Sequence, residues 1–242
     1  ARALVEHGLN STVNKIWYSG PFFRHERPQK GRYRQFHQFG AEFIGVEGYE
    51  ADVEMISLVN FMWEKLDIKP LLKINTIGDL EDRKKYTSVL LEYFSKYKND
   101  FNENEKDKIK FNPLRLLDSK NDNIKEIIKQ APKITSYISK EAKLHFDNTL
   151  NILDKKGISY EQDDKLVRGL DYYNRTVFEY VDENQKSQNT ICAGGRYDFL
   201  FENLCDKKIP ALGFAIGIER LLEYIDYKLD IKKSNIFYFA VM

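Results

Sequence analysis

Five basic side chains between Phe22 and Gln35 could together bind an anion. They are Arg24, Arg27, Lys30, Arg32 and Arg34. One acidic side chain, Glu26, lies among them, and the whole chain has a net charge of only +1. The positive charge is therefore local to this segment. A basic edge strand protected against aggregation has the same composition, so the pattern alone leaves an anion site and a solvated edge as equal alternatives.

The second half of this segment is expected to be a β-strand with a polar face. A period of two puts five residues on one face: Arg34, Phe36, Gln38, Gly40 and Glu42. Burying the Gln38 amide and the Glu42 carboxylate without partners would cost on the order of several kcal/mol. We therefore expect these two side chains to meet a polar ligand, water or another polar element.

A further arginine, Arg168, stands beside Gly169 in the sequence LVRGLDYY. Glycine permits a close backbone approach, so this guanidinium could reach a bound group. A strand-edge bulge with an Arg168–Asp171 ion pair is the alternative interpretation.

Residues 211–225 are predicted to form a strand followed by a helix, and Arg220 falls in the first helical turn. A cation at that position opposes the helix dipole, so a role in holding an anion or stacking on a flat group would explain it. An ordinary surface arginine is the alternative. Residues 193–198 (AGGRYD) are predicted to form a glycine turn, because a Gly-Gly pair marks a turn more often than a phosphate-binding loop.

Other chemistries fit the sequence less well. Two cysteines, Cys192 and Cys205, are too few and too far apart for a zinc site or a disulfide framework. Neither a P-loop nor a GxGxxG motif occurs. Arginines without an obvious general base suit phosphoryl or nucleotidyl transfer by charge stabilisation. The four histidines, at positions 7, 25, 37 and 145, lack metal-ligand spacing and a nucleophile motif. His25 and His37 are expected to have structural roles.

The composition is that of an ordinary globular protein. The chain has 242 residues, with 42% hydrophobic and 31% charged residues and a mean hydropathy of −0.55. This apolar content excludes a disordered chain. No stretch approaches the roughly 20 uninterrupted apolar residues of a membrane span. With two cysteines and no visible signal peptide, we expect a cytoplasmic location.

Apolar spacing predicts the elements that position these residues. Helices are expected over 1–9 and 50–66, and a helical unit over about 80–160. Strands are expected over 16–26, 32–46 and 71–77, with a turn at 28–31, and a β-type pattern returns from 165. A β-rich core with a helical insertion is the simplest interpretation.

Four segments together resemble the histidyl-tRNA synthetase family of class II aminoacyl-tRNA synthetases. FRHERPQKGRYRQFHQFGAE resembles motif 2, LVRGLDYY and AGGRYD resemble the two histidine-specific motifs, and GFAIGIERL resembles motif 3. The resemblance implies an α+β fold, an antiparallel sheet flanked by helices with a helical insertion domain. It implies a catalytic core over 1–81 and 163–234, an insertion over 82–162, and the start of an anticodon-binding domain over 235–242.

The resemblance also implies an activity, that of a histidine–tRNA ligase. Such an enzyme joins L-histidine and ATP into histidyl-adenylate and pyrophosphate, then transfers histidine to the 3′ end of tRNA(His). The implied cofactors are ATP as a substrate and Mg²⁺ on its outer phosphates, and the implied assembly is a homodimer without membrane contact. A dimer-forming motif 1 and an Arg-Pro-Glu-Gly-Thr loop are expected upstream, and the anticodon-binding domain after residue 242.

Residue roles carry over from the resemblance by position. ATP would contact Arg24 at the α-phosphate, Arg32 at the outer phosphates, and Phe36 and Arg220 on the two faces of adenine. Histidine would contact Gln38 through its amino group. Its two imidazole nitrogens would contact Glu42 and Tyr173. Gly40 would leave room between Gln38 and Glu42. Tyr172 and Tyr197 would line that pocket. Arg168 and Arg24 would be catalytic, Arg168 by stabilising charge on the α-phosphate, and no residue is implied as a metal ligand.

Two other functions remain as alternatives. One is a non-catalytic relative that regulates histidine biosynthesis or senses uncharged tRNA. Such relatives usually lose parts of LVRGLDYY or the motif 2 arginines, and the biosynthetic regulators lack the insertion. The matching residues and the insertion present here favour the ligase. The other alternative is an RNA-binding module with an inactive pocket, whose RNA binding would depend on salt but not on histidine.

Overall fold

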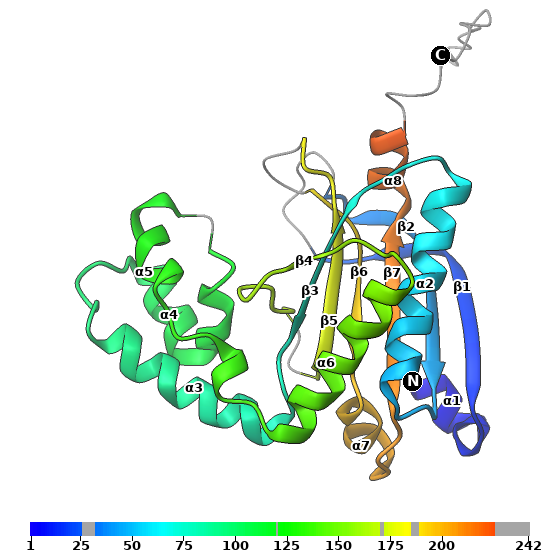
Figure 1. Ribbon diagram of the computed structural model, residues 1–242, viewed down its shortest axis with the longest axis horizontal. Helices are drawn as coiled ribbons and strands as arrows, with labels where there is room; N and C mark the ends of the chain where they lie inside the picture. The colour runs from blue at the N-terminus through cyan, green and yellow to red at the C-terminus, as the bar shows by residue number, and fades with distance from the viewer. Residues whose placement is uncertain (26–31, 120, 170–171, 185–188, 226–242) are drawn as a thin grey trace, which may run out of the picture.

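The computed structural model describes residues 1–25, 32–119, 121–169, 172–184 and 189–225. Three predictions rest on residues outside these ranges: the turn at 28–31, the Arg168–Asp171 pair and the start of an anticodon-binding domain at 235–242. Within them, the chain folds around a seven-stranded sheet with the strand order β1-β2-β7-β6-β5-β3-β4 (Figure 1). The strands are β1 (Asn14–Phe23), β2 (Gln35–Ile44), β3 (Leu71–Thr76), β4 (Glu161–Gln162), β5 (Asn174–Val181), β6 (Thr190–Arg196) and β7 (Ala211–Gly217).

The α+β fold class is confirmed, but the sheet is mixed. β1, β2, β7, β6, β5 and β3 pair with their neighbours in antiparallel fashion. β4 pairs with β3 in parallel, through Lys73 opposite Glu161 and Ile74 opposite Gln162. The sheet is therefore antiparallel, as expected, except for this two-residue strand at one edge.

The alternation predicted for β2 is observed. Phe36, Gln38 and Glu42 line a pocket on one side of the sheet. Ala41 and Phe43 are buried in a hydrophobic core on the other side. Because successive strand residues point to opposite faces, β2 separates the pocket from this core.

Two long helices cover the core side of the sheet. In Figure 1, α2 (Tyr49–Lys65) and α6 (Lys140–Lys155) run side by side in front of the strands. The predicted apolar stripe of α2 is buried there, with Ile56 and Val59 fully enclosed. Ser139 starts α6, and its hydroxyl accepts a hydrogen bond from the Ala142 N–H at 3.1 Å.

The segment between β3 and α6 folds into a helical lobe beside the sheet (Figure 1). Its elements are α3 (Leu80–Ser95), α4 (Glu103–Phe111), η2 (Pro113–Leu116), η3 (Asp122–Ile124), α5 (Lys125–Lys129) and η4 (Ile134–Ser136). Asp79 and Asn102 begin α3 and α4 with capping boxes, which satisfy the first backbone N–H groups. The lobe encloses its own core around Tyr86, Leu90 and Phe94.

Short helices complete the fold. They are α1 (Arg2–Glu6), η1 (Leu9–Ser11), α7 (Phe199–Cys205) and α8 (Ile218–Ile225). α1 ends at Glu6, short of the predicted residue 9, and Gly8 follows with a φ of 67°, in the left-handed region that favours glycine. α8 directly follows β7, as the sequence predicted for 211–225.

The predicted glycine turn at Gly194 and Gly195 is wrong, because both residues lie inside β6. A Cβ on Gly194 would come within 2.6 Å of the Phe178 ring. Gly195 has a φ of 154°, and a Cβ there would lie 2.7 Å from the carbonyl oxygen of Thr176. The two glycines are therefore needed for close strand packing rather than for a change of chain direction.

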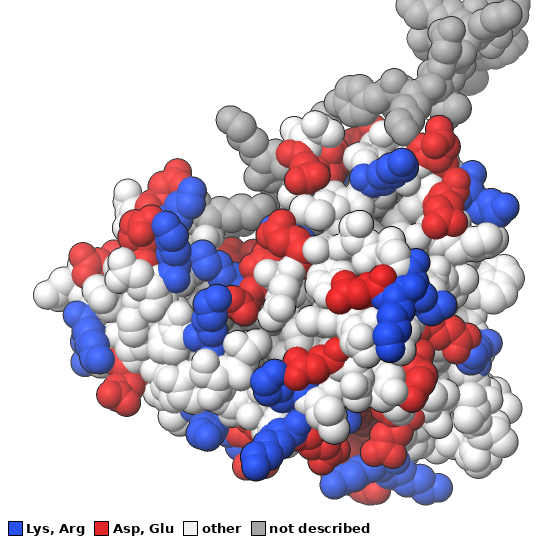
Figure 2. Space-filling model, in the orientation of Figure 1, with Lys and Arg blue, Asp and Glu red and all other residues white. Residues whose placement is uncertain are grey.

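Acidic and basic side chains are interspersed over the face that Figure 2 shows. This mixture agrees with the net charge of +1. Among the described helices, none combines the length and the apolar character needed to cross a bilayer.

Candidate active site

One pocket of about 1000 Å³ contains all ten residues that the resemblance singled out. It lies against the face of β2 that points away from α2. The residues come from the β1–β2 hairpin, from the segment before β5, from the end of β6 and from α8. They are Arg24, Arg32, Phe36, Gln38, Glu42, Arg168, Tyr172, Tyr173, Tyr197 and Arg220.

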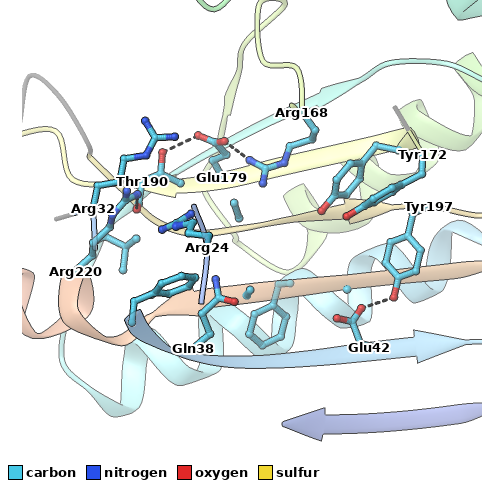
Figure 3. A pocket seen from close by; sticks show the side chains of 18 of the residues that line it. Arg24, Arg32, Gln38, Glu42, Arg168, Tyr172, Glu179, Thr190, Tyr197 and Arg220 are labelled. Atoms are coloured by element: carbon cyan, nitrogen blue, oxygen red, sulfur yellow. Dashed lines mark hydrogen bonds and ion pairs between the residues drawn. The ribbon is translucent and has the colours of Figure 1, made fainter. Parts of the chain in front are cut away.

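A hydrogen-bonded carboxylate marks one end of the pocket (Figure 3). Glu42 accepts hydrogen bonds from the Tyr197 hydroxyl and, at 3.1 Å, from the Tyr18 hydroxyl. Burial raises the pKa of Glu42 to about 7, although the two hydroxyl donors act to lower it. Burial and the nearby carboxylate raise the pKa of Tyr18 and of Tyr197, so both hydroxyls remain donors. This end of the pocket therefore holds a fixed acceptor that titrates near neutral pH.

Tyr18 is a pocket residue that the sequence analysis did not identify. It lies opposite Gly40 in the β1–β2 pairing, and a Cβ on Gly40 would come within 2.5 Å of the Tyr18 ring. The expectation that Gly40 leaves room for a ligand between Gln38 and Glu42 is therefore corrected, because the Tyr18 ring fills that room. A large ring opposite a glycine was the available signal, but it requires the strand register to be known.

Three tyrosines form a wall beside the carboxylate. The rings of Tyr172 and Tyr173 lie 4.8 Å apart between centroids, and Tyr197 meets Tyr172 edge-on at 6.0 Å. Such a wall combines flat apolar surface with hydroxyl groups, which suits a planar polar ring.

Arg168 is held in the pocket by two neighbours. It forms an ion pair with Glu179 of β5, and its Cζ lies 5.5 Å from the centre of the Tyr173 ring. Glu179 also accepts a hydrogen bond from the Thr190 hydroxyl at 2.9 Å. Burial raises the pKa of Glu179, although Arg168 acts to lower it. Glu179 and Tyr173 thus fix the position of the guanidinium.

Three arginines gather at the other end of the pocket: Arg24, Arg32 and Arg220 (Figure 3). Burial, together with repulsion from Arg24 and Arg32, lowers the pKa of Arg220. Arg220 also donates to the Thr190 carbonyl at 2.8 Å. A bound anion would relieve the mutual repulsion of these cations. With Glu42 at one end and guanidinium groups at the other, the pocket is electrostatically polarised.

Two protein side chains pack against the ring of Phe36, the residue on which adenine was expected to stack. The guanidinium of Arg24 lies over its ring, with Cζ 4.1 Å from the ring centre, and Phe22 stacks against the same ring at 6.1 Å. The resemblance implied adenine on this ring, with Arg220 on the far side of the base. Stacking of a base on the face that Arg24 covers requires this side chain to move away.

The basic cluster is divided between the pocket and its surroundings. Arg24 and Arg32 line the pocket. Arg34 precedes β2, which begins at Gln35, so the predicted alternation does not reach it and it is absent from the lining. Arg27 and Lys30 lie outside the described residues.

His37 has the structural role that was predicted for it. Its backbone N–H donates to Glu219 at 2.8 Å, and its Nδ1 lies 3.0 Å from the same carboxylate. These contacts also keep the pKa of Glu219 below its usual range, although burial acts to raise it. Because Arg220 is the next residue, this link between β2 and α8 also fixes the start of the helix that carries it.

Arg196 of the AGGRYD segment supports the pocket from behind. Its side chain is fully buried and donates to Asp52 at 2.5 Å and to the carbonyls of Val46 and Gly48 at 3.0 Å. Although burial acts to raise it, Arg196 and His145 hold the pKa of Asp52 at about 2. This buried network anchors the end of β6, directly before Tyr197.

The helical lobe also contributes to the pocket, through Lys108, Asp118 and Ser119. The sequence analysis did not identify them, since the lobe looked like a separate unit and no local pattern connects it to the sheet. Among the described residues, no group of three or more His, Cys, Asp or Glu side chains could hold a metal ion.

The fold and this pocket define a class of protein. A family model described as the tRNA synthetase class II core domain (G, H, P, S and T) matches residues 1–226, and the chain belongs to this family. Within it, the chain is 47% identical over 224 residues to the histidine–tRNA ligase of Neisseria meningitidis serogroup B. It is 48% identical over 238 residues to the chloroplastic histidine–tRNA ligase of Gracilaria tenuistipitata var. liui.

These matches cover 91% and 98% of this chain but only 52% and 57% of the two relatives. The chain thus spans about half the length of the curated relatives it matches. The crystal structure of apo S. aureus histidyl-tRNA synthetase superposes with a TM-score of 0.73 at 34% identity, over 96% of this chain and 57% of that one. An ATP phosphoribosyltransferase regulatory subunit/histidyl-tRNA synthetase from Bacillus halodurans C, at 21% identity and a TM-score of 0.63, shares the fold.

Proposed function

We propose that this chain forms the adenylation site of a histidine–tRNA ligase. The site joins L-histidine to ATP and releases pyrophosphate, and the whole protein then transfers histidine to the 3′ end of tRNA(His). The observation that carries the proposal is the polarity of one pocket: a Glu42 carboxylate among tyrosines at one end, arginines at the other, and Gln38 between them. An amino acid with a polar ring and a polyphosphate fit such a pocket together.

The Glu42 end suits a neutral imidazole. That ring presents one N–H donor and one acceptor nitrogen. Glu42 accepts from the N–H, and a tyrosine hydroxyl, proposed to be that of Tyr173, donates to the other nitrogen. Tyr172 and Tyr197 line the ring, while Gln38 binds the α-amino group. A site that must satisfy buried polar groups in this way can reject a ring that lacks them by a factor of about 10⁴–10⁵.

The arginine end suits the transfer itself. A carboxylate oxygen of histidine attacks the α-phosphorus of ATP, the bond from that phosphorus to the bridging oxygen breaks, and pyrophosphate leaves. The nucleophile is already an anion, so no general base is required. Arg24 and Arg168 stabilise charge at the α-phosphate, and Arg32 binds the outer phosphates.

The adenine of ATP is proposed to lie between Phe36 and Arg220. Arg24 covers the Phe36 ring, so this guanidinium is proposed to move off the ring and turn toward the α-phosphate when adenine stacks there. Mg²⁺ is proposed to arrive with ATP, bound to its outer phosphates. No protein side chain is proposed as a ligand of this ion.

The rest of the proposal concerns the whole protein. We propose that it is a cytoplasmic homodimer, that residues 1–81 and 163–234 form its catalytic core, and that 82–162 are an insertion. Residues 235–242 would begin the anticodon-binding domain. α6, at the end of the insertion, packs against α2 and so attaches the insertion to the core.

The experiment is histidine-dependent ATP–pyrophosphate exchange, with phenylalanine and no amino acid as controls. Exchange with histidine alone supports the proposal. Exchange that does not depend on histidine, or none even in the whole protein, contradicts it and favours the non-catalytic relative. Salt-dependent RNA binding without any histidine dependence would favour the RNA-binding module.

A further inference from the structure

Two arginines of the helical lobe donate hydrogen bonds to backbone carbonyls of the pocket segment that carries Arg168 and Tyr173. Arg115 in η2 donates from Nη2 to the carbonyl of Gly169 at 2.6 Å. Arg83 in α3 donates from Nη1 to the carbonyl of Tyr173 at 2.8 Å. The first carbonyl directly follows Arg168, and the second belongs to a pocket tyrosine.

The same segment packs on the core of the lobe. Leu166 is buried in that core, and Val167 and Tyr173 pack against it. The carbonyl of Leu166 also accepts a hydrogen bond from the buried Asn75 side chain of β3 at 3.0 Å. The segment therefore has two sides: its backbone is fastened to the lobe and β3, while the side chain of Arg168 enters the pocket (Figure 3).

The chemistry of these two hydrogen bonds suits a role of the arginines in positioning the pocket segment, rather than in packing alone. A hydrogen bond from a guanidinium to a carbonyl is charge-assisted and directional, so it fixes the acceptor in angle as well as in distance. A polar site also tolerates little displacement, since an error of about 1 Å in a positioning residue can cost a factor of about 10² in rate. Neither arginine lines the pocket, so the contact of each with the pocket segment is made through the backbone that it holds.

We propose that Arg83 and Arg115 are positioning residues of the histidine and α-phosphate sites. Arg83 sets the place of the Tyr173 ring, and Arg115 sets the place of the Arg168 guanidinium. The lobe is then a structural part of the amino-acid site. The kinetic form of this inference rests on the proposed histidine adenylation.

The test uses the whole protein in ATP–pyrophosphate exchange without tRNA, so that a role of these arginines in RNA binding cannot affect the result. Arg83→Met should raise the KM for histidine by about tenfold, the loss expected for one charge-assisted hydrogen bond. Arg115→Met should mainly lower kcat by a similar factor of about ten. The KM for ATP should change by less than about twofold in the Arg83 variant, because Tyr173 does not face the nucleotide in this proposal.

Matched controls come from the same lobe. Lys84→Met removes the neighbouring cation of α3, which pairs with Glu81 at the surface, and Lys106→Met does the same in α4, where the partner is Glu103. Both controls should match the wild-type protein. Arg115→Lys should recover part of the lost rate, since an ammonium group can still donate to one carbonyl.

A second measurement does not depend on activity. Hydrogen–deuterium exchange of the peptide that contains Arg168 and Tyr173 should accelerate in Arg83→Met and Arg115→Met but not in the two lysine controls. If both arginine variants match the controls in exchange kinetics and in deuterium uptake, the inference is wrong. If the wild-type protein itself shows no histidine-dependent reaction, the proposed function fails, and deuterium uptake alone decides on the positioning role. A variant that loses its thermal transition is replaced by the corresponding Arg→Lys variant.

Discussion

Gly213 of β7 lies directly opposite Glu42 of β2, and the Glu42 carboxylate occupies the space that a side chain at residue 213 would need. A Cβ on Gly213 would overlap Oε2 of Glu42 and would lie 2.8 Å from the carbonyl oxygen of Ala41. The acidic end of the pocket thus depends on a glycine far along the chain from Glu42.

Gly213→Ala should displace the Glu42 carboxylate. We expect the KM for histidine to rise by about tenfold or more, the loss of a charged hydrogen bond, with a smaller change in the KM for ATP. Pyrophosphate exchange at varied histidine and varied ATP measures both. Gly20→Ala is the control, since a Cβ on Gly20 meets nothing within 4 Å. Equal changes for the two substrates would separate Gly213 from the histidine site.

Glu42 should make stability depend on pH. Burial raises the pKa of Glu42 from 4.5 to about 7 in the folded protein. Between these two pH values the folded state binds more protons than the unfolded state. The stabilisation that Glu42 contributes is therefore fully present below about pH 4.5 and is lost as the pH rises through about 7. Relative to Glu42→Gln, the wild-type free energy of unfolding should fall across this window, by at most about 1.4 kcal/mol per pH unit. Urea unfolding of both proteins at about pH 5 and about pH 8 measures the difference, and parallel pH profiles would contradict the raised pKa.

Arg168→Ala should slow adenylation by a factor of about 10²–10³, the effect of losing one preorganised charge-stabilising donor. Pyrophosphate exchange gives the rate, and a thermal melt shows whether the variant is folded, because the change leaves Glu179 without its ion-pair partner. Arg168→Lys keeps the positive charge but lacks the planar set of N–H donors of a guanidinium, so it should recover only part of the rate. An unchanged rate in Arg168→Ala would remove the catalytic role.

Arg196→Met should destabilise the fold. The change leaves the buried Asp52 carboxylate without its main cation, and breaking such a pair costs about 3–5 kcal/mol. Urea unfolding at neutral pH, where Asp52 is ionised, measures the loss. Arg2→Met is the control, since the Arg2–Glu6 pair is exposed and should contribute little. Similar stability of the two variants would mean that the buried pair adds no more than a surface pair.

The sequence by itself predicted the elements that carry the pocket. The period of two in β2 put Phe36, Gln38 and Glu42 on one face, and the apolar spacing over 50–66 predicted the helix that is observed as α2. The resemblance then named ten residues, and all of them line one pocket. The element predictions succeed because backbone periods are properties of short segments, whereas the ten residues came from the resemblance and their roles stay predictions.

Tertiary structure alone decided which groups meet. The Tyr18–Glu42 hydrogen bond depends on the β1–β2 register, and the ion pair of Arg168 with Glu179 depends on how two distant segments pack. The glycines of β6 looked like a turn because a Gly-Gly pair has the same local signal whether the chain reverses or two strands pack closely. The hydrogen bonds from Arg83 and Arg115 to the pocket segment connect the helical lobe to the chain just before β5. Such contacts are set by register and by packing between distant segments, and no short stretch of sequence contains that information.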